Sequence, residues 1–332
     1  MPSTRENWFD ISKGICILLV VVNHAGTGIL KSGVGVKSSG WSFFHDFSYA
    51  FMVPVFFFFS GYFSNRSKKS SLAALKSLAA RICYPYVLWL FLQFAVLKLS
   101  GGGNRNVEWN QFGEALLTGW MQFWFLHALI FIVLFDVAFK ALKIPKNFRM
   151  LVAVAAYMGA YQLDVSVPIV KAFLTHLLYY EVGFSFTLLS VGKIKASTYW
   201  VTGFLGFLTV CFLELNNASY GTSLRFFAAI AGIFGVVSFA KLIDSAPRNR
   251  LFHFLSLCGQ YSLQIYLTHV IFSAGIRFVL LKINLDSFAM HLLIGSIMGV
   301  IFPLVLAKFD AKYLGALFRF PVRREPDLKP VV

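Results

Sequence analysis

The chain has 332 residues, of which 58% are hydrophobic, 17% aromatic and only 13% charged. A soluble domain carries about twice that share of charged residues, so the composition excludes a water-soluble fold and indicates a polytopic membrane protein. The formal net charge of +16 does not indicate a nucleic-acid partner, because no soluble module carries a basic run interleaved with aromatic residues. We expect this charge to act on membrane topology and on anionic lipid headgroups.

Ten apolar segments are predicted to be transmembrane helices, because a bilayer core needs roughly 20 apolar residues per helix. They are residues 11–30, 46–63, 82–99, 120–139, 150–163, 169–190, 198–213, 224–242, 262–281 and 287–306. The first is too long for a signal-peptide core and is expected to remain as the first helix. The sequence therefore predicts an all-α integral membrane protein, with one transmembrane domain over 1–306 and a basic cytoplasmic tail over 307–332.

Basic residues are distributed unequally between alternate loops. With the N-terminus inside the cell, 22 of the 30 Lys and Arg residues fall on the cytoplasmic side. The eight on the other side are Lys31, Lys37, Lys98, Arg105, Lys171, Arg225, Arg277 and Lys282. The positive-inside rule thus predicts a multi-pass protein of the cell (inner or plasma) membrane with both termini cytoplasmic. The four cysteines have no metal-ligand spacing, so no metal site is expected. No bound cofactor is expected either.

The first predicted helix, within RENWFDISKGICILLVVVNHAG, carries Asp10, Lys13 and His24. An ionisable group inside a span costs roughly 2.5–3.5 kcal/mol on insertion scales, which makes each a functional candidate. Lys13 and His24, eleven residues apart, lie within about 20° of one helix face and about 16 Å apart in depth. His24 is either a general base or a core histidine bonded to another helix, and Asp10 and Lys13 can form an ion pair at the helix start.

Basic residues also precede the third predicted helix, which begins RICYPYVLW. Pro85 frees a backbone carbonyl and is expected to bend this helix. Arg81, together with Lys76, can hold the phosphates of a nucleotide-like ligand through charged hydrogen bonds. From these residues alone, ordinary positive-inside anchoring is the favoured explanation.

Two further segments place polar groups inside apolar surroundings. The second helix ends FMVPVFFFFSGYFSN, where Ser60 and Gly61 are predicted to permit close helix packing. The fourth begins QFWFLHALI, in which Trp124 is typical of an interfacial belt and His127 is typical of a structural histidine.

The ninth predicted helix, in GQYSLQIYLTHV, carries Ser262, Tyr266 and His269 at spacings of four and three. These spacings place the three side chains on one face. Three polar groups on one intramembrane stripe indicate either a lined cavity or an interhelical hydrogen-bond network.

Several of these motifs together resemble the acyltransferase family 3 membrane proteins, and especially their fucose O-acetylase-like branch. The resemblance is carried by KGICILLVVVNH, FFFFSGY, RICYPYVLW, WFLHAL and SLQIYLTH, which occur in the expected order over most of the chain. It implies transfer of an acyl group, usually acetyl from acetyl-CoA as co-substrate, to a sugar hydroxyl. The acceptor would be a surface polysaccharide or a lipid-linked glycan.

The resemblance also assigns roles. It implies that His24 is the essential residue and that Lys13, where many relatives have Arg, is its basic partner, with Asp10 beside it. Acyl-CoA phosphates would lie at the basic cytoplasmic face, which is formed by Lys13, Lys76 and Arg81. The candidates for substrate contact or oxyanion stabilisation are Ser262, Tyr266, His269, Trp124 and His127. General-base and covalent acyl-histidine catalysis both remain open.

The alternative hypothesis is a secondary transporter or glycan flippase, in which the intramembrane polar residues line a substrate path. The absence of an obvious internal repeat weighs against it. A non-catalytic assembly partner has no reason to carry a basic residue and a histidine on one helix face.

Overall fold

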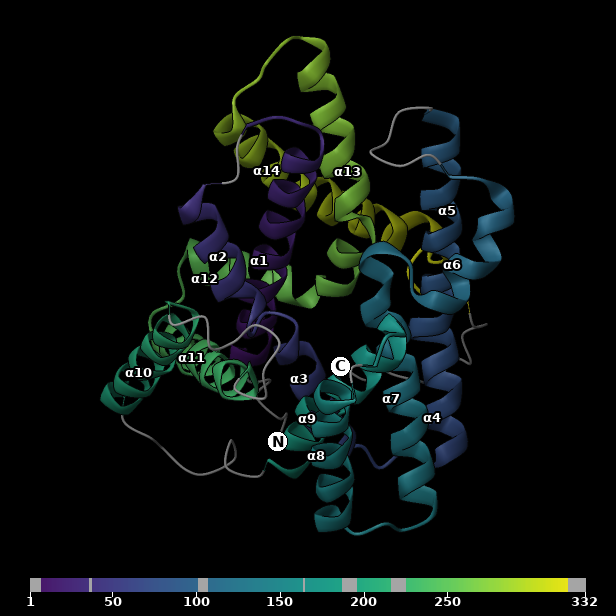
Figure 1. Ribbon diagram of the computed structural model, residues 1–332, viewed down its shortest axis with the longest axis vertical. Coiled ribbons are helices and arrows are strands. Elements are labelled where there is room, and N and C mark those ends of the chain that lie inside the picture. Colours follow the sequence, from purple (N-terminus) through teal and green to yellow (C-terminus); the bar gives the residue numbers. More distant parts are fainter. Residues whose placement is uncertain are drawn as a thin grey trace.

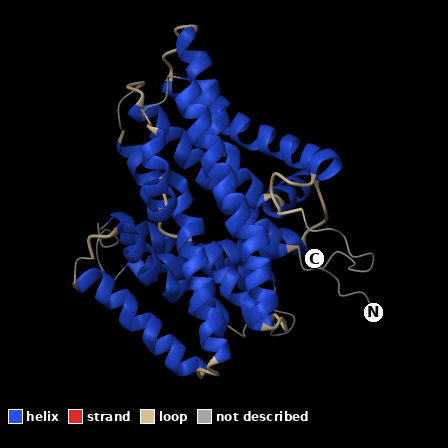
Figure 2. Ribbon diagram, turned by 90° about the vertical axis from the view of Figure 1, so that its right-hand side faces the viewer, coloured by secondary structure: helices blue, strands red, loops and turns tan. Residues whose placement is uncertain are grey.

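The computed structural model describes residues 7–35, 38–100, 107–163, 165–186, 196–215 and 225–321. Within these ranges every regular element is a helix and no strand occurs, which confirms the predicted all-α class (Figure 2). The α-helices are α1 (Trp8–Lys31), α2 (Ser39–Tyr49), α3 (Pro54–Arg66), α4 (Ser71–Leu78), α5 (Tyr84–Ser100), α6 (Phe112–Thr118), α7 (Trp124–Ala141), α8 (Lys146–Gln162), α9 (Pro168–Ser185), α10 (Ala196–Leu215), α11 (Arg225–Ser245), α12 (Arg250–Gln260), α13 (Ser262–Lys282) and α14 (Phe288–Phe309).

Eight helical segments of the described ranges are long and apolar enough to cross a bilayer. They are Trp8–Lys31, Ser39–Arg66, Ser71–Leu99, Trp109–Ala141, Ser197–Leu215, Arg225–Ser245, Ser262–Lys282 and Phe288–Leu314. The protein is therefore a polytopic membrane protein. The other two predicted spans correspond to α8 and α9, which are helical but fall outside this set, so the total of ten and the orientation of the termini stay predictions.

Prolines set several helix boundaries. The predicted span 46–63 is interrupted, because α2 ends at Tyr49 and α3 begins at Pro54, whose fixed φ suits the first turn of a helix. Just before Pro85, residues 79–83 form a π-helical turn that joins α4 to α5. Proline has no N–H to donate, which accounts for the altered hydrogen-bond register there.

Helix α1 occupies the middle of the molecule and packs against α11, α12, α13 and α14 (Figure 1). Its contact with α12 depends on two glycines. A Cβ atom on Gly14 would collide with the carbonyl oxygen of Leu255, and one on Gly259 would collide with that of Asp10. The absence of these side chains lets the two backbones touch and fixes the position of α1.

Helices α3 and α9 also pack closely through two glycines. A Cβ atom on Gly61 would collide with the carbonyl oxygen of Tyr180, and one on Gly183 would collide with that of Phe58. The close packing predicted at Gly61 is therefore confirmed.

A buried ionic cluster joins α3, α7, α8 and α9. Arg149 Nη2 lies 2.6 Å from Asp136 Oδ1 and 2.6 Å from Glu181 Oε1, and its Nε donates to Glu181 Oε2 at 2.9 Å. Asp136 also contacts Lys140 at 3.0 Å and accepts from Ser64 Oγ at 2.6 Å. Arg149 is one of the 22 basic residues that the topology prediction places on the cytoplasmic side. The structure instead buries its side chain, which is 2% exposed.

The segment after α14 is folded. Helix α14 continues to Phe309, and residues 310–314 form a further π-turn. Phe318 stacks on Trp89 of α5 with ring centroids 5.3 Å apart, and the indole of Trp89 donates to the carbonyl of Leu317 at 2.8 Å. The first part of the predicted tail thus packs against the helical domain.

Candidate active site

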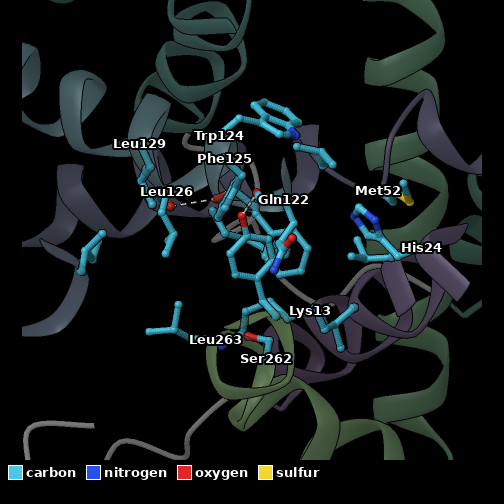
Figure 3. A pocket seen from close by; sticks show the side chains of 18 of the residues that line it. Lys13, His24, Met52, Gln122, Trp124, Phe125, Leu126, Leu129, Ser262 and Leu263 are labelled. Atoms are coloured by element: carbon cyan, nitrogen blue, oxygen red, sulfur yellow. Dashed lines mark hydrogen bonds between the residues drawn. The ribbon is translucent and has the colours of Figure 1, made fainter. Parts of the chain in front are cut away.

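A cavity of about 250 Å³ lies between α1, α2, α3, α7 and α13 (Figure 3). It is lined by Lys13, Ile17, Val20, His24, Tyr49, Met52, Val53, Phe56, Phe59, Ser60, Phe63, Ile82, Gln122, Trp124, Phe125, Leu126, Leu129, Ser262, Leu263 and Tyr266. Most of these side chains are apolar, and a few polar groups project among them. Such a lining is typical of small-molecule sites.

Helix α1 forms one wall of this cavity with a single stripe. Lys13, Ile17, Val20 and His24 follow one another at intervals of four, three and four residues, and all four line the cavity. The predicted shared face of Lys13 and His24 is therefore present. Lys13 Nζ also contacts Asp10 Oδ1 at 2.9 Å, so the ion pair weighed as an alternative exists as well. Lys13 remains at the cavity wall while it is paired.

His24 faces the cavity and its ring contacts His269 of α13, with centroids 5.1 Å apart. His269 is completely buried. Its Nδ1 lies 2.9 Å from the carbonyl oxygen of Ile265 and 2.8 Å from that of Tyr266. Because a carbonyl only accepts hydrogen bonds, Nδ1 carries the proton.

The other nitrogen of His269 is then an acceptor when the ring is neutral. This Nε2 is buried and has no hydrogen-bond partner among the described residues. A histidine in this tautomer has no N–H left for an oxyanion. It can accept a hydrogen bond from His24, whose ring lies against it.

Helix α13 also supplies Ser262 and Tyr266 to the cavity. The hydroxyl of Tyr266 donates to the backbone carbonyl of Gln122, and the side chain of Gln122 donates to Gln93 Oε1 at 2.6 Å. These bonds fix the short segment that precedes α7. The polar stripe predicted on this helix therefore serves both as cavity wall and as interhelical network.

Trp124 and His127 separate in the structure. Trp124 lines the cavity, and its ring lies 5.3 Å from that of His176. His127, nearly one turn along α7, instead packs between Tyr86 and Phe131, with ring centroids at 5.8 and 5.0 Å. His127 is not among the residues that line the cavity.

The two basic residues before α5 lie differently. Arg81 is exposed in the π-turn and directly precedes Ile82, which lines the cavity. Lys76 is exposed on α4 and does not line it. Of the two, only Arg81 is adjacent in the chain to a residue that lines the cavity.

Sequence reasoning overlooked several lining residues, of which Gln122 and Tyr49 are the most polar. Gln122 is 2% exposed and precedes an apolar helix, so an amide inside a membrane segment is the signal that would have identified it. Tyr49 carries no comparable signal, because tyrosine is common at membrane interfaces. The described residues contain no group of three or more side chains suited to a metal ion.

Comparison with known protein families identifies the family of the domain that contains this cavity. A family model described as an acyltransferase domain, Acyl_transf_3, matches residues 6–308. The chain belongs to acyltransferase family 3. It is therefore a membrane acyltransferase, and every residue that lines the cavity lies within the matched region. No curated protein and no solved structure matches this chain.

Proposed function

We propose that this protein transfers an acetyl or similar short acyl group from acyl-CoA to a sugar hydroxyl of a surface polysaccharide or lipid-linked glycan. The observation that carries the proposal is the placement of His24 and Lys13 on one wall of a mostly apolar cavity inside the family domain. The family match favours acyl transfer over the transporter alternative. The expected location is the cell inner or plasma membrane.

The donor would enter at the cytoplasmic end. Lys13 and Arg81 would meet the phosphates of CoA, which are its most strongly charged groups. About 16 Å separates Lys13 from His24 along α1, so a narrow, largely apolar arm must reach inward. The lining residues Ile17, Val20 and Phe59 suit such an arm.

His24 would act as the general base. Its ring nitrogen takes the proton of the sugar hydroxyl while the sugar oxygen forms a bond to the thioester carbonyl carbon. The tetrahedral intermediate then collapses, the carbon–sulfur bond breaks, and the departing thiolate of CoA receives that proton from His24. The products are the O-acyl glycan and CoA with a free thiol, so protons and electrons balance.

His269 would hold His24 in the required tautomer. If one N–H of His24 is directed to the acceptor Nε2 of His269, the remaining nitrogen presents its lone pair to the cavity. Orientation of a base by a buried partner is the logic of catalytic triads. This role replaces the expected oxyanion contact of His269, because its Nδ1 proton is engaged by two carbonyls.

The decisive experiment is His24→Ala, assayed by transfer of labelled acetyl from acetyl-CoA to a glycan acceptor in purified protein. General-base catalysis contributes about 10²–10⁴-fold, and we expect a loss of that size. His253→Ala is the matched control, because His253 is exposed on α12 and does not line the cavity. Full activity of His24→Ala would refute the proposal.

The transporter alternative predicts a different result. It requires solute accumulation in vesicles without acyl-CoA, and this is measured with the same preparation.

A further inference from the structure

A polar stripe runs along most of α13. Ser262, Tyr266, His269, Ser273 and Arg277 follow one another at intervals of four, three, four and four residues, which places them on one helix face. Ser262 and Tyr266 line the cavity, and His269 contacts His24. Arg277 continues the stripe about two turns past His269, away from Lys13. In the predicted orientation this is the extracytoplasmic side.

Arg277 lies directly against the backbone of α1. A Cβ atom on Gly28 would collide with Nη1 of Arg277, so the guanidinium occupies the space that a side chain would fill. Gly28 is one turn beyond His24, about 6 Å along the helix axis. The arginine therefore stands beside the helix that carries the proposed base and close to the same level.

The described residues supply no carboxylate to Arg277. None of their ion pairs includes it, although its side chain is only partly exposed. Helix α14, which packs on α13, has no acidic residue between Phe288 and Phe309. Asp286, which follows α13 in the chain, is exposed. Asp46, the acidic residue of α2, is bonded to His45 at 2.8 Å.

A charge in this position that no described carboxylate balances is costly, which indicates that Arg277 has a functional role. A merely anchoring arginine extends its head toward the lipid headgroups. Arg277 instead rests on the bare backbone of Gly28, at a central helix of the fold.

A second cation lies on the same side of α1. Lys31 is seven residues from His24, within about 20° of the same face and about 10 Å further out. Lys31 and Arg277 are two of the eight basic residues that the positive-inside rule places outside. Their location at the outer end of α1, beyond His24, favours a negatively charged ligand.

We propose that Arg277, with Lys31, binds an oxyanion carried by the acceptor, either a sugar carboxylate or a phosphate of a lipid-linked glycan. This inference rests on the proposed function and narrows its substrate class. The acceptor hydroxyl sits at His24 while its anionic group, roughly one helical turn further out, meets the guanidinium. The acceptor of this acyltransferase is therefore an acidic glycan or a lipid-diphosphate-linked sugar.

The test measures acetyl transfer by the purified full-length protein in lipid nanodiscs. Three acceptors are compared: a disaccharide that contains glucuronic acid, the same disaccharide with its carboxyl reduced to the alcohol, and an isoprenyl-diphosphate-linked sugar. We expect the KM of at least one anionic acceptor to be about tenfold or more below that of the neutral one, as a charged hydrogen bond provides. The preferred anionic acceptor then shows whether the bound oxyanion is a sugar carboxylate or a phosphate of a lipid-linked glycan.

Two variants connect that preference to the arginine. Arg277→Gln is expected to raise the KM of the anionic acceptor about tenfold, with kcat and the KM of acetyl-CoA unchanged. Gly28→Ala is expected to give the same change with the arginine still present, since the added methyl displaces the guanidinium. Lys282→Gln, on the same helix, is the matched control and should leave all constants unchanged.

Normal kinetics of each variant with the neutral acceptor show that it is folded. The inference is overturned if the wild type treats neutral and anionic acceptors alike, or if Arg277→Gln raises both KM values equally. A wild type that acetylates none of the three acceptors overturns the proposed acetyl transfer, and this inference with it.

Discussion

Replacement of Arg149 by methionine is the sharpest test of what holds the cavity-bearing helices together. Arg149 and Lys140 balance the charges of Asp136 and Glu181, and the first of these cations makes three hydrogen bonds of 2.6, 2.6 and 2.9 Å. Arg149→Met leaves two buried carboxylates with Lys140 as the remaining cation of the cluster. Removal of one partner of a buried ion pair costs about 3–5 kcal/mol, and we expect a loss of unfolding free energy in that range.

Denaturation of the protein in mixed micelles, followed by circular dichroism, measures this loss. The double variant Arg149→Met/Glu181→Gln restores charge balance, so its cost should be smaller than the sum of the two single costs by about 1.5 kcal/mol or more. Lys146→Met is the control, because Lys146 is exposed on the same helix. Additive single costs, or an Arg149→Met loss no greater than that of Lys146→Met, would refute the reasoning.

Three further predictions follow from the site and its supports. His269→Leu should lower kcat about tenfold, whereas His269→Gln should lower kcat less, because its amide oxygen still accepts a hydrogen bond. Steady-state kinetics measure both losses, and equal losses would contradict an orienting role. Gly259→Ala should destabilise the fold by about 1–3 kcal/mol through overpacking, while Gly275→Ala, which meets open space, should be nearly neutral in the same denaturation experiment. Arg81→Ala should raise the KM of acetyl-CoA about tenfold and Lys76→Ala much less, and an unchanged KM for Arg81→Ala would indicate simple anchoring.

The helical class and the α1 stripe follow from local pattern alone. Apolar runs of bilayer length indicate membrane helices because no other regular structure hides its backbone polar groups within a single segment. The common face of Lys13 and His24 needs only the helical period, and both residues do line one cavity. Pro54 also indicates the break between α2 and α3, although the predicted span 46–63 runs across it.

Contacts between helices distant in the chain were not readable in this way. His24 and His269 are 245 residues apart, and only the packing of α1 against α13 brings their rings to 5.1 Å. The same holds for Arg149, which counts as an ordinary cytoplasmic charge until α7, α8 and α9 pack together and bury it between two carboxylates.

Composition and periodicity thus determined what each helix is and which of its faces is polar. The tertiary structure alone decided which polar faces meet, because that depends on close approach at positions such as Gly14, Gly61 and Gly259. The sequence shows where each glycine lies, but it does not show which helix backbone packs against that glycine. That pairing of faces is what turns His24 from a lone intramembrane histidine into a candidate base with a buried partner.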